Sequence, residues 1–299
     1  MDSVSQLPTA TGELQPPSGS EDHLERLTQL CVDDLISAFG LDGMSHGRAM
    51  MESISRIPAR RLALQVLTYD RIVGESGLGA GGAWALKRLS RNARIEGQKN
   101  VPREGPLLLV SNHPGLADAV ALFASTPRDD LRVIAADRPF LKALPNTSRY
   151  LLTVAETSAE RSGVVRKAAR HLRGGGAVLT FPGGRIEPDP AVLPGAVEAL
   201  NRWSSSADLF ARLIPGLAVV PVVVSGVISP SALRNPLIHV RRHRRDREWL
   251  AATLQVLVPA LRNVVARVDF GRPIHAEPGA VGDAVIEETR RLMENRTTA

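Results

Sequence analysis

From residue 92 onward, short apolar runs alternate with segments of helical periodicity, and no other feature of the chain constrains the fold as strongly. Short apolar runs bounded by turn residues are typical of buried strands, whereas longer amphipathic segments are typical of helices. The predicted strands are residues 107–110, 131–136, about 150–155, 177–181, 217–224 and 264–270. The predicted helices are residues 114–125, 163–173, about 246–262 and 280–294. The alternation predicts an α/β domain over residues 92–299, with a mixed, largely parallel sheet flanked by helices.

The first 91 residues have a different character. Residues 1–20 lack an apolar pattern and are rich in Ser, Pro and Gly, which predicts a disordered tail. In residues 21–91 helical patterns occur without a credible strand. The first of them spaces apolar residues near helical period before Gly40, namely Leu24, Leu27, Leu30, Leu35 and Phe39. Further helical segments are expected at residues 46–57, 59–73 and 81–91, so residues 21–91 form a helical lead-in to the α/β domain.

Cysteine content and the N-terminal sequence bear on the compartment. Cys31 is the only cysteine, so no intramolecular disulfide can form, which suits a reducing environment. Residues 1–20 lack the basic and apolar regions of a secretory signal. We therefore expect a cytoplasmic protein.

One stretch, residues 213–233, has no charged side chain before Arg234 over a length that could cross a bilayer. Pro and Gly interrupt it, at Pro215, Gly216, Pro221, Gly226 and Pro230. Its centre is dense in β-branched Val, as a buried strand would be. The stretch predicts a strand and not a transmembrane helix.

The net charge is +6, from 37 Lys and Arg against 31 Asp and Glu, and the sequence pI is about 10.2. A basic balance fits a phosphate-rich partner, whether nucleic acid, anionic lipid or a phosphorylated small molecule. Aromatic residues make up only 4% of the chain and no known nucleic-acid-binding module is evident, so nucleic acid is the least favoured of the three.

The densest basic segment is "RNPLIHVRRHRRDREW", residues 234–249. Each basic residue near an anionic bilayer contributes up to about 1 kcal/mol to binding. We therefore expect an anionic membrane surface to be contacted by Arg241, Arg242, Arg244, Arg245 and Arg247. A solvated basic loop is the alternative.

The sequence "LLLVSNHPGLADA" places His113 at the end of a predicted strand and Asp118 five residues later. Inside one helix, five steps of about 100° would set these side chains about 140° apart, so they could not readily meet. Pro114 favours a helix start, which places Asn112 or His113 at the cap and lets the ring bend over the first turn towards Asp118.

A carboxylate that accepts a hydrogen bond from one ring nitrogen raises the basicity of the other, as a general base requires. His113 and Asp118 are therefore candidate catalytic residues. The alternative is a simple helix cap and an exposed helical Asp.

A second candidate site follows the predicted strand at residues 177–181, in "FPGGRIEP". Consecutive glycines allow the backbone to approach a ligand closely, and Arg can grip phosphate or carboxylate. The candidate substrate-binding residues are Phe181, Pro182, Gly183, Gly184, Arg185 and Glu187. A glycine-rich turn with an exposed Arg is the alternative.

These motifs together resemble the glycerolipid acyltransferase family, which includes the lysophosphatidic acid acyltransferases. "NHPGLAD" matches the family's His-x4-Asp signature, and "FPGGR" resembles its Phe-Pro-Glu-Gly-Thr-Arg block. "VVPVVVSG" resembles its Val-Pro-Val strand, and "VDFGRPI" its closing Gly-x-Pro strand. The resemblance spans about residues 94–275, and its four blocks occur in the family's order.

The resemblance implies an enzyme that transfers a fatty acyl group from acyl-CoA or acyl carrier protein to a hydroxyl of a glycerolipid-like acceptor. His113 would remove the hydroxyl proton and Asp118 would support the imidazolium. The implied partners are the acyl donor, the lipid acceptor and the inner face of an anionic membrane, on which the enzyme would be peripheral. No cofactor or metal is implied beyond the donor as co-substrate.

Two further points concern the acceptor. Arg161 is placed like the family's arginine that holds acceptor phosphate, although a solvated Arg at a helix start is the alternative. The family's acidic residue after Phe-Pro is Gly183 here, so Glu187 is a candidate to supply that carboxylate. "PGGRIE" also resembles the Pro-Gly-Gly-x-x-Glu block of the diacylglycerol acyltransferases, which carry a different His motif, so the acceptor stays open.

Two other interpretations of the sequence compete with an acyltransferase. "GLGAGG", residues 77–82, has the spacing of a dinucleotide-binding loop, but the preceding residues indicate a helix where that loop needs a strand. The alternative of another functional class is a catalytically silent protein with an acyltransferase fold that binds anionic lipid or nucleic acid.

Overall fold

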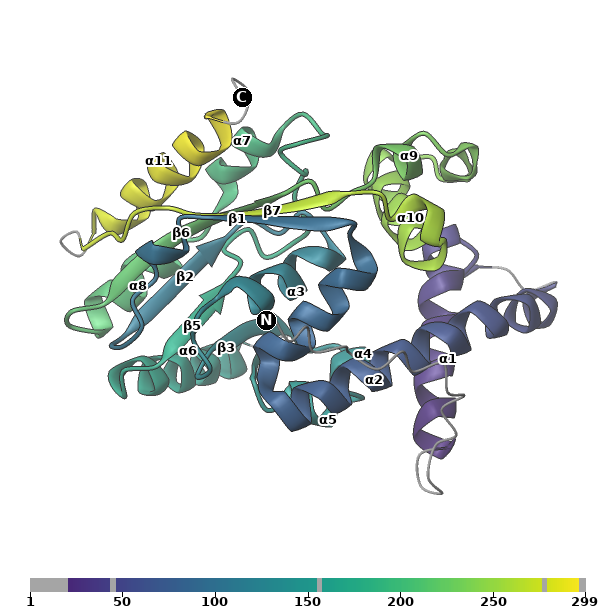
Figure 1. The fold of residues 1–299 in the computed structure, drawn as a ribbon, viewed down its shortest axis with the longest axis horizontal. Coiled ribbons are helices and arrows are strands. Elements are labelled where there is room, and N and C mark those ends of the chain that lie inside the picture. Colours follow the sequence, from purple (N-terminus) through teal and green to yellow (C-terminus); the bar gives the residue numbers. More distant parts are fainter. Residues whose placement is uncertain (1–20, 44–46, 155–157, 276–278, 296–299) are drawn as a thin grey trace, which may run out of the picture.

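The computed structural model describes residues 21–43, 47–154, 158–275 and 279–295, and the predicted disordered tail at residues 1–20 lies outside them. A seven-stranded sheet runs through the molecule (Figure 1). Its strands are β1 (Asn92–Glu96), β2 (Leu107–Ser111), β3 (Arg132–Ala136), β4 (Leu151–Val154), β5 (Ala177–Thr180), β6 (Ala218–Ser225) and β7 (Val265–Phe270). Their spatial order is β1-β7-β6-β2-β5-β3-β4.

Five neighbouring strands, β6, β2, β5, β3 and β4, are mutually parallel. β7 runs antiparallel to β6 and pairs with β1 in parallel. The predicted mixed, largely parallel sheet is therefore confirmed. The carboxyl ends of the five parallel strands meet at one edge, where open α/β sheets generally bind ligands.

Helices cover both faces of the sheet (Figure 1). The α-helices are α1 (Glu21–Phe39), α2 (Arg48–Leu89), α3 (Leu116–Ser125), α4 (Pro139–Lys142), α5 (Pro145–Ser148), α6 (Ser158–Arg173), α7 (Ala196–Ala199), α8 (Ser206–Leu213), α9 (Pro230–Leu233), α10 (Arg244–Leu257) and α11 (Val281–Glu294). Short 3₁₀ turns are η1 (Gln98–Asn100), η2 (Leu200–Arg202), η3 (Pro236–Val240) and η4 (Pro259–Leu261).

The alternating side chains of β2 show how the two faces are built. Leu107 and Leu109 join the cluster formed with α1, α2 and α3, whereas Leu108 and Val110 join the cluster formed with α6, α8 and α11. All four are essentially inaccessible to solvent, because a parallel strand covered on both sides needs apolar residues on both. This double burial explains why the strand is a continuous apolar run.

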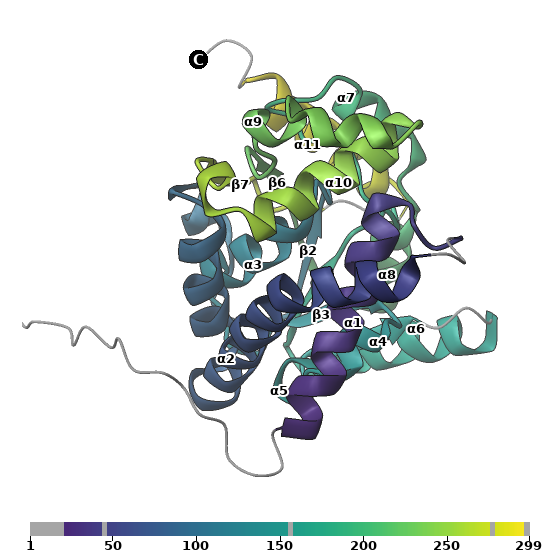
Figure 2. The ribbon, with the colours of Figure 1, turned by 90° about the vertical axis from the view of Figure 1, so that its right-hand side faces the viewer.

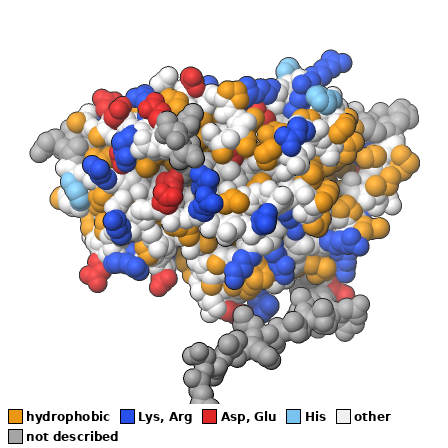
Figure 3. All heavy atoms as spheres, turned by 45° about the horizontal axis from the view of Figure 1, so that its top comes forward, with side chains coloured by type: hydrophobic (Ala, Val, Ile, Leu, Met, Phe, Trp, Pro, Cys, Tyr) orange, Lys and Arg blue, Asp and Glu red, His pale blue; other side chains and the backbone are white. Residues whose placement is uncertain are grey.

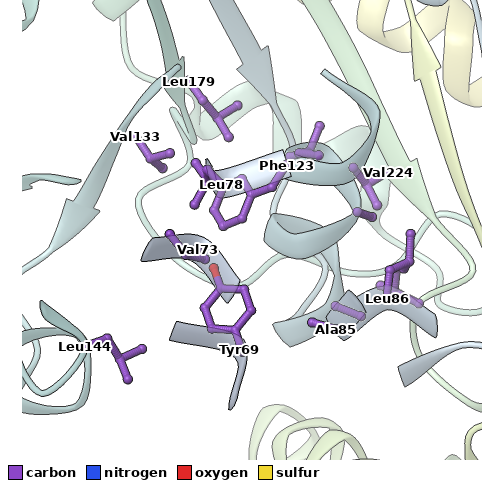
Figure 4. Close-up of a cluster of buried hydrophobic side chains, with 14 of the residues drawn as sticks. Tyr69, Val73, Leu78, Ala85, Leu86, Phe123, Val133, Leu144, Leu179 and Val224 are labelled. Atoms are coloured by element: carbon purple, nitrogen blue, oxygen red, sulfur yellow. The ribbon is translucent and has the colours of Figure 1, made fainter. Parts of the chain in front are cut away.

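The helical lead-in shares its core with the sheet. Figure 4 shows Tyr69, Val73 and Leu78 of α2 beside Phe123 of α3, with β-strand side chains above them. Gly82 lets the two helices approach closely, because a Cβ there would lie 2.7 Å from the Cβ of Phe123. Gly82 belongs to the segment at residues 77–82 that has the spacing of a dinucleotide-binding loop. In the structure this glycine allows close packing of two helices.

Several elements differ from the sequence expectations. The predicted helices at 46–57, 59–73 and 81–91 are replaced over residues 48–89 by one element, α2, whose backbone is non-helical at Gly77 (φ 85°, ψ 171°). Residue 46 lies outside the described residues. Strand β1 was not predicted, since its sequence is polar and four of its five residues are exposed at the sheet edge. Helix α8 was also not predicted, because it is a single short element in a Ser-rich stretch.

The Val-rich stretch that could have imitated a membrane span is the fully buried strand β6, as predicted. Within the described ranges, no helix combines the length and apolarity needed to span a bilayer.

Candidate active site

His113 follows β2, the middle strand of the sheet, and Asn112 fixes the turn between them. The Asn112 side-chain amide donates to the carbonyl of Val224 at 2.9 Å, and its oxygen accepts from the Val224 N–H at 2.8 Å. The Asn112 side chain thus makes the two backbone hydrogen bonds to β6 that a further residue of β2 would otherwise make. Because Asn112 is buried with both amide groups bonded, the next residue leaves the sheet in a fixed direction.

Asp118 receives the His113 ring. Nδ1 of His113 lies 2.7 Å from Oδ2 of Asp118, and Asp118 is fully buried. The predicted cap, Asn112 or His113, is wrong: α3 begins at Leu116 with Gly115 as its N-cap, and Pro114 precedes the cap. The reason is that the Asp118 carboxylate itself accepts the Gly115 N–H at 3.0 Å, which satisfies the helix start.

The surroundings of Asp118 fix which ring nitrogen is protonated. Besides the ring, the carboxylate accepts the backbone N–H of Gly115 and of Ala119, the latter at 2.5 Å. A carboxylate that accepts from all three requires the His113 Nδ1 to be the donor. Nε2 is left with no hydrogen-bond partner among the described residues, and the side chain is 31% exposed. Nε2 is therefore unpaired, on a ring that is partly open to solvent.

Burial alone would lower the pKa of His113, but the neighbouring carboxylates reverse its effect. The charge of Asp118 and its hydrogen bond raise the pKa, as does the charge of Glu187, and the balance lies above the ordinary value. The ring also packs against Phe181, with centroids 4.6 Å apart and a tilt of 32°. The arrangement thus combines a basic ring nitrogen with a fixed orientation.

The segment Phe181–Glu187 follows β5, which is adjacent to β2, so the two sequence motifs meet. Pro182 is buried, whereas Gly184, with φ at +62°, and Arg185 are exposed. Glu187 does not face solvent as a substrate ligand would. Its side chain turns back over Gly183 and accepts the His113 N–H.

The two candidate arginines follow different strands of the sheet. Arg185 follows β5, one strand from β2, and is exposed. Arg161 belongs to α6, which follows β4, three strands from β2. The side chain of Arg161 lies outside the described residues.

The basic segment is only partly a free surface. Arg241 pairs with Asp246 at 2.9 Å and reaches the Ser37 carbonyl, so its side chain is only 17% exposed. Arg247 donates to the Arg241 carbonyl, and Arg244 pairs with Glu248 at 2.7 Å. Arg241 thus links α10 to α1, and Arg247 bonds to the backbone of Arg241, whereas contact of the five arginines with a membrane stays a prediction.

Arg242 and Arg245 are exposed, and neither has a hydrogen-bond or ion-pair partner in the described part of the chain. Apolar side chains are exposed close by in sequence, Leu237 (50%) and Val240 (58%), and on the first turns of α2, Met50 (62%), Ile54 (61%) and Ile57 (66%). The end of the molecule formed by α1, α2 and α10 faces the viewer in Figure 2. In Figure 3, basic and hydrophobic side chains are interspersed on this side.

Sequence reasoning missed three residues that shape the site. Asn112 was considered only as a cap, Trp203 was not singled out, and neither was Asp189, which is fully buried and accepts the N–H groups of Gly226, Val227 and Ile228. The position of Asp189 between two prolines in "EPDP" is the one sequence signal that could have indicated it. No group of three or more His, Cys, Asp or Glu in the described ranges is arranged to hold a metal ion.

Comparison with known families agrees with the resemblance predicted from the motifs. Residues 92–225 match the model of the family described as Acyltransferase. Among solved structures, the chain is similar to the 1-acyl-sn-glycerophosphate (LPA) acyltransferase PlsC from Thermotoga maritima. That similarity has 15% identity and a TM-score of 0.44, covering 91% of this chain and 94% of that one. No curated protein sequence matches the chain.

Proposed function

We propose that this protein is an acyltransferase that moves a fatty acyl group from a thioester donor to a hydroxyl of a glycerolipid-like acceptor, with His113 as general base. The observation that carries the proposal is the 2.7 Å contact of His113 Nδ1 with buried Asp118, which leaves Nε2 without a hydrogen-bond partner among the described residues. The donor would be acyl-CoA or acyl carrier protein.

The chemistry follows from the geometry. Nε2 of His113 accepts the proton of the acceptor hydroxyl while the oxygen attacks the thioester carbonyl. The carbon–sulfur bond then breaks, the ester forms, and the imidazolium returns its proton to the departing thiolate. Asp118 stabilises the imidazolium between these two steps, and no covalent acyl-enzyme is needed.

Arg185 is the better candidate to hold an anionic acceptor headgroup. It is exposed, lies one strand from His113 and has no hydrogen-bond or ion-pair partner among the described residues. Guanidinium binds phosphate through two parallel hydrogen bonds.

The lipid acceptor suggests where the enzyme works. Arg242 and Arg245 are exposed, as are apolar side chains of η3 and of the start of α2, and both kinds of side chain suit contact with an anionic bilayer. We include peripheral binding to the inner face of such a membrane in the proposal.

The test measures free thiol released from acyl-CoA, or from acyl carrier protein, in the presence of candidate lysophospholipids, with the product identified by mass spectrometry. The proposal expects thiol and acylated lipid in equal amounts, and neither without acceptor. Thioester hydrolysis with no acylated lipid from any hydroxyl acceptor would contradict it.

A further inference from the structure

Glu187 contacts the backbone of His113 at two points. The Glu187 N–H donates to the His113 carbonyl at 2.8 Å, and the His113 N–H donates to Oε2 of Glu187 at 3.1 Å. The residue is only 6% exposed. Its peptide and carboxylate together hold the peptide unit from which the ring projects, and the carboxylate is not free to bind substrate.

The second carboxylate oxygen is also held. Trp203 donates its indole N–H to Oε1 of Glu187 at 2.8 Å, and the neighbouring Ser204 N–H donates to the Pro182 carbonyl at 3.1 Å. Three segments that are distant in sequence therefore meet at the carboxylate of Glu187. They are the segments that follow β2, β5 and η2. A buried carboxylate with both oxygens bonded is well suited to fixing relative positions.

The missing side chain at position 183 makes this arrangement possible. A Cβ on Gly183 would lie 2.7 Å from Oε1 and 2.8 Å from Cδ of Glu187. Gly183 is not in the left-handed region, so its backbone would accept other residues once that space was vacated. The carboxylate of Glu187 thus occupies the volume into which a side chain at position 183 would project.

We propose that Glu187 is a positioning residue for the base: it fixes the backbone of His113 and places a second negative charge near the ring, in addition to Asp118. The proposal rests on the assignment of His113 as base. We also propose that an acidic residue at position 183 could place its carboxylate where that of Glu187 lies.

The charged groups around the ring agree with this role. Asp118 of α3 and Glu187 both raise the pKa of His113. Burial raises the pKa of Glu187, while Trp203, the His113 N–H and the charges of His113 and Arg202 lower it. Burial is the largest of these causes, so the pKa of Glu187 lies above its ordinary value, while the donors and cations act in favour of the ionised carboxylate.

The first test replaces Glu187 by Gln and follows the His113 ring by NMR as pH is varied, with no substrate present. Gln has nearly the same shape but carries no charge, and one of the two N–H donors loses its acceptor. We expect a lower ring pKa and a fall in kcat of about 10- to 100-fold with little change in KM. The control is Glu198→Gln, an exposed glutamate of α7, which leaves both unchanged.

The second test moves the carboxylate. Glu187→Ala vacates the space, and adding Gly183→Asp returns a carboxylate to the same volume. We expect Gly183→Asp/Glu187→Ala to recover at least about tenfold of the activity lost in Glu187→Ala, together with the raised ring pKa. Gly183→Asn/Glu187→Ala matches its volume without the charge and recovers neither.

An unchanged ring pKa in folded Glu187→Gln would overturn the proposal, because Glu187 would then be a structural contact only. The NMR titration needs no catalysis, so it reports on Glu187 even if the protein transfers no acyl group. Failure of the proposed function is seen instead in the absence of acylated product from the wild-type protein.

Discussion

Around His113, at the carboxyl end of β2, the acidic side chains are buried and bond to His113, whereas the charged side chains of residues 241–247 are mostly at the surface. Asp118 and Glu187 are 0% and 6% exposed, and each accepts two or more hydrogen bonds. Arg242 and Arg245 are exposed and have no such partners within the described ranges. The dense run of arginines in the sequence therefore lies mostly at the surface. The two acids of the candidate site, Asp118 and Glu187, are far apart in the sequence and buried in the structure.

The difference teaches what each kind of charge can do. A buried carboxylate acts at full strength on its neighbour, because little water screens it. Exposed charges are screened within about 10 Å at ordinary salt and act mainly by their number. Variants of the first group should alter chemistry or stability sharply, and variants of the second should alter binding gradually.

The largest effect is expected for Asp118→Asn. The amide cannot support the imidazolium, and its NH₂ group would face the Gly115 or Ala119 N–H. Acyl transfer should fall about 10²- to 10⁴-fold. Steady-state thiol release measures the loss, and Asp129→Asn, an exposed acid, is the control that should stay at the wild-type rate. A folded Asp118→Asn with near-normal activity would contradict the charge role.

The next effect concerns stability at Asp189, which organises the loop after β6. Replacement by Asn leaves at least one of its buried N–H partners, from Ala191, Gly226, Val227 and Ile228, without an acceptor. We expect the free energy of unfolding to fall by about 3 kcal/mol. Urea denaturation compares it with Asp129→Asn, for which a change below about 0.5 kcal/mol is expected. Equal free energies of unfolding for Asp189→Asn and Asp129→Asn would contradict the stabilising role of the Asp189 carboxylate.

The pH dependence tests the raised pKa of His113. A general base must be neutral, so kcat/KM should fall about tenfold per pH unit below that raised pKa, at a pH above the ordinary value of about 6.5. The contribution of His113 to the free energy of unfolding depends on pH in the opposite direction. The raised pKa favours folding fully below about pH 6.5, and this contribution is lost as pH rises through the folded-state pKa. An acid limb of kcat/KM lying below pH 6.5 would contradict this environment.

The smallest effect is expected at the basic surface. Arg242→Gln and Arg245→Gln should each weaken binding to anionic vesicles by up to about fivefold, and high salt should remove the difference. Arg241→Gln is the matched variant, because its guanidinium joins α10 to α1. It should lower stability and change vesicle binding less. Cosedimentation and denaturation separate the two, and identical behaviour of Arg241 and Arg242 variants would undo the distinction.

The sheet was largely predictable from the sequence, and the site only in part. Buried parallel strands are continuous apolar runs, so β2, β5 and β6 stood out, whereas the polar edge strand β1 did not. The pairing of His113 with Asp118 is local and could be expected from spacing. The contacts of Asn112 with Val224 and of Glu187 with His113 join residues far apart in sequence, so they depend on strand order, which local patterns do not specify.

The central claim is that the His113 ring, held by Asp118, removes the proton from the acceptor hydroxyl. The most direct measurement is the rate of thiol release from acyl donor with acceptor for purified His113→Ala, after circular dichroism and urea denaturation show that it folds like the wild type. The account predicts a rate about 10²- to 10⁴-fold lower. A folded His113→Ala that transfers acyl groups within a few-fold of the wild-type rate would contradict it.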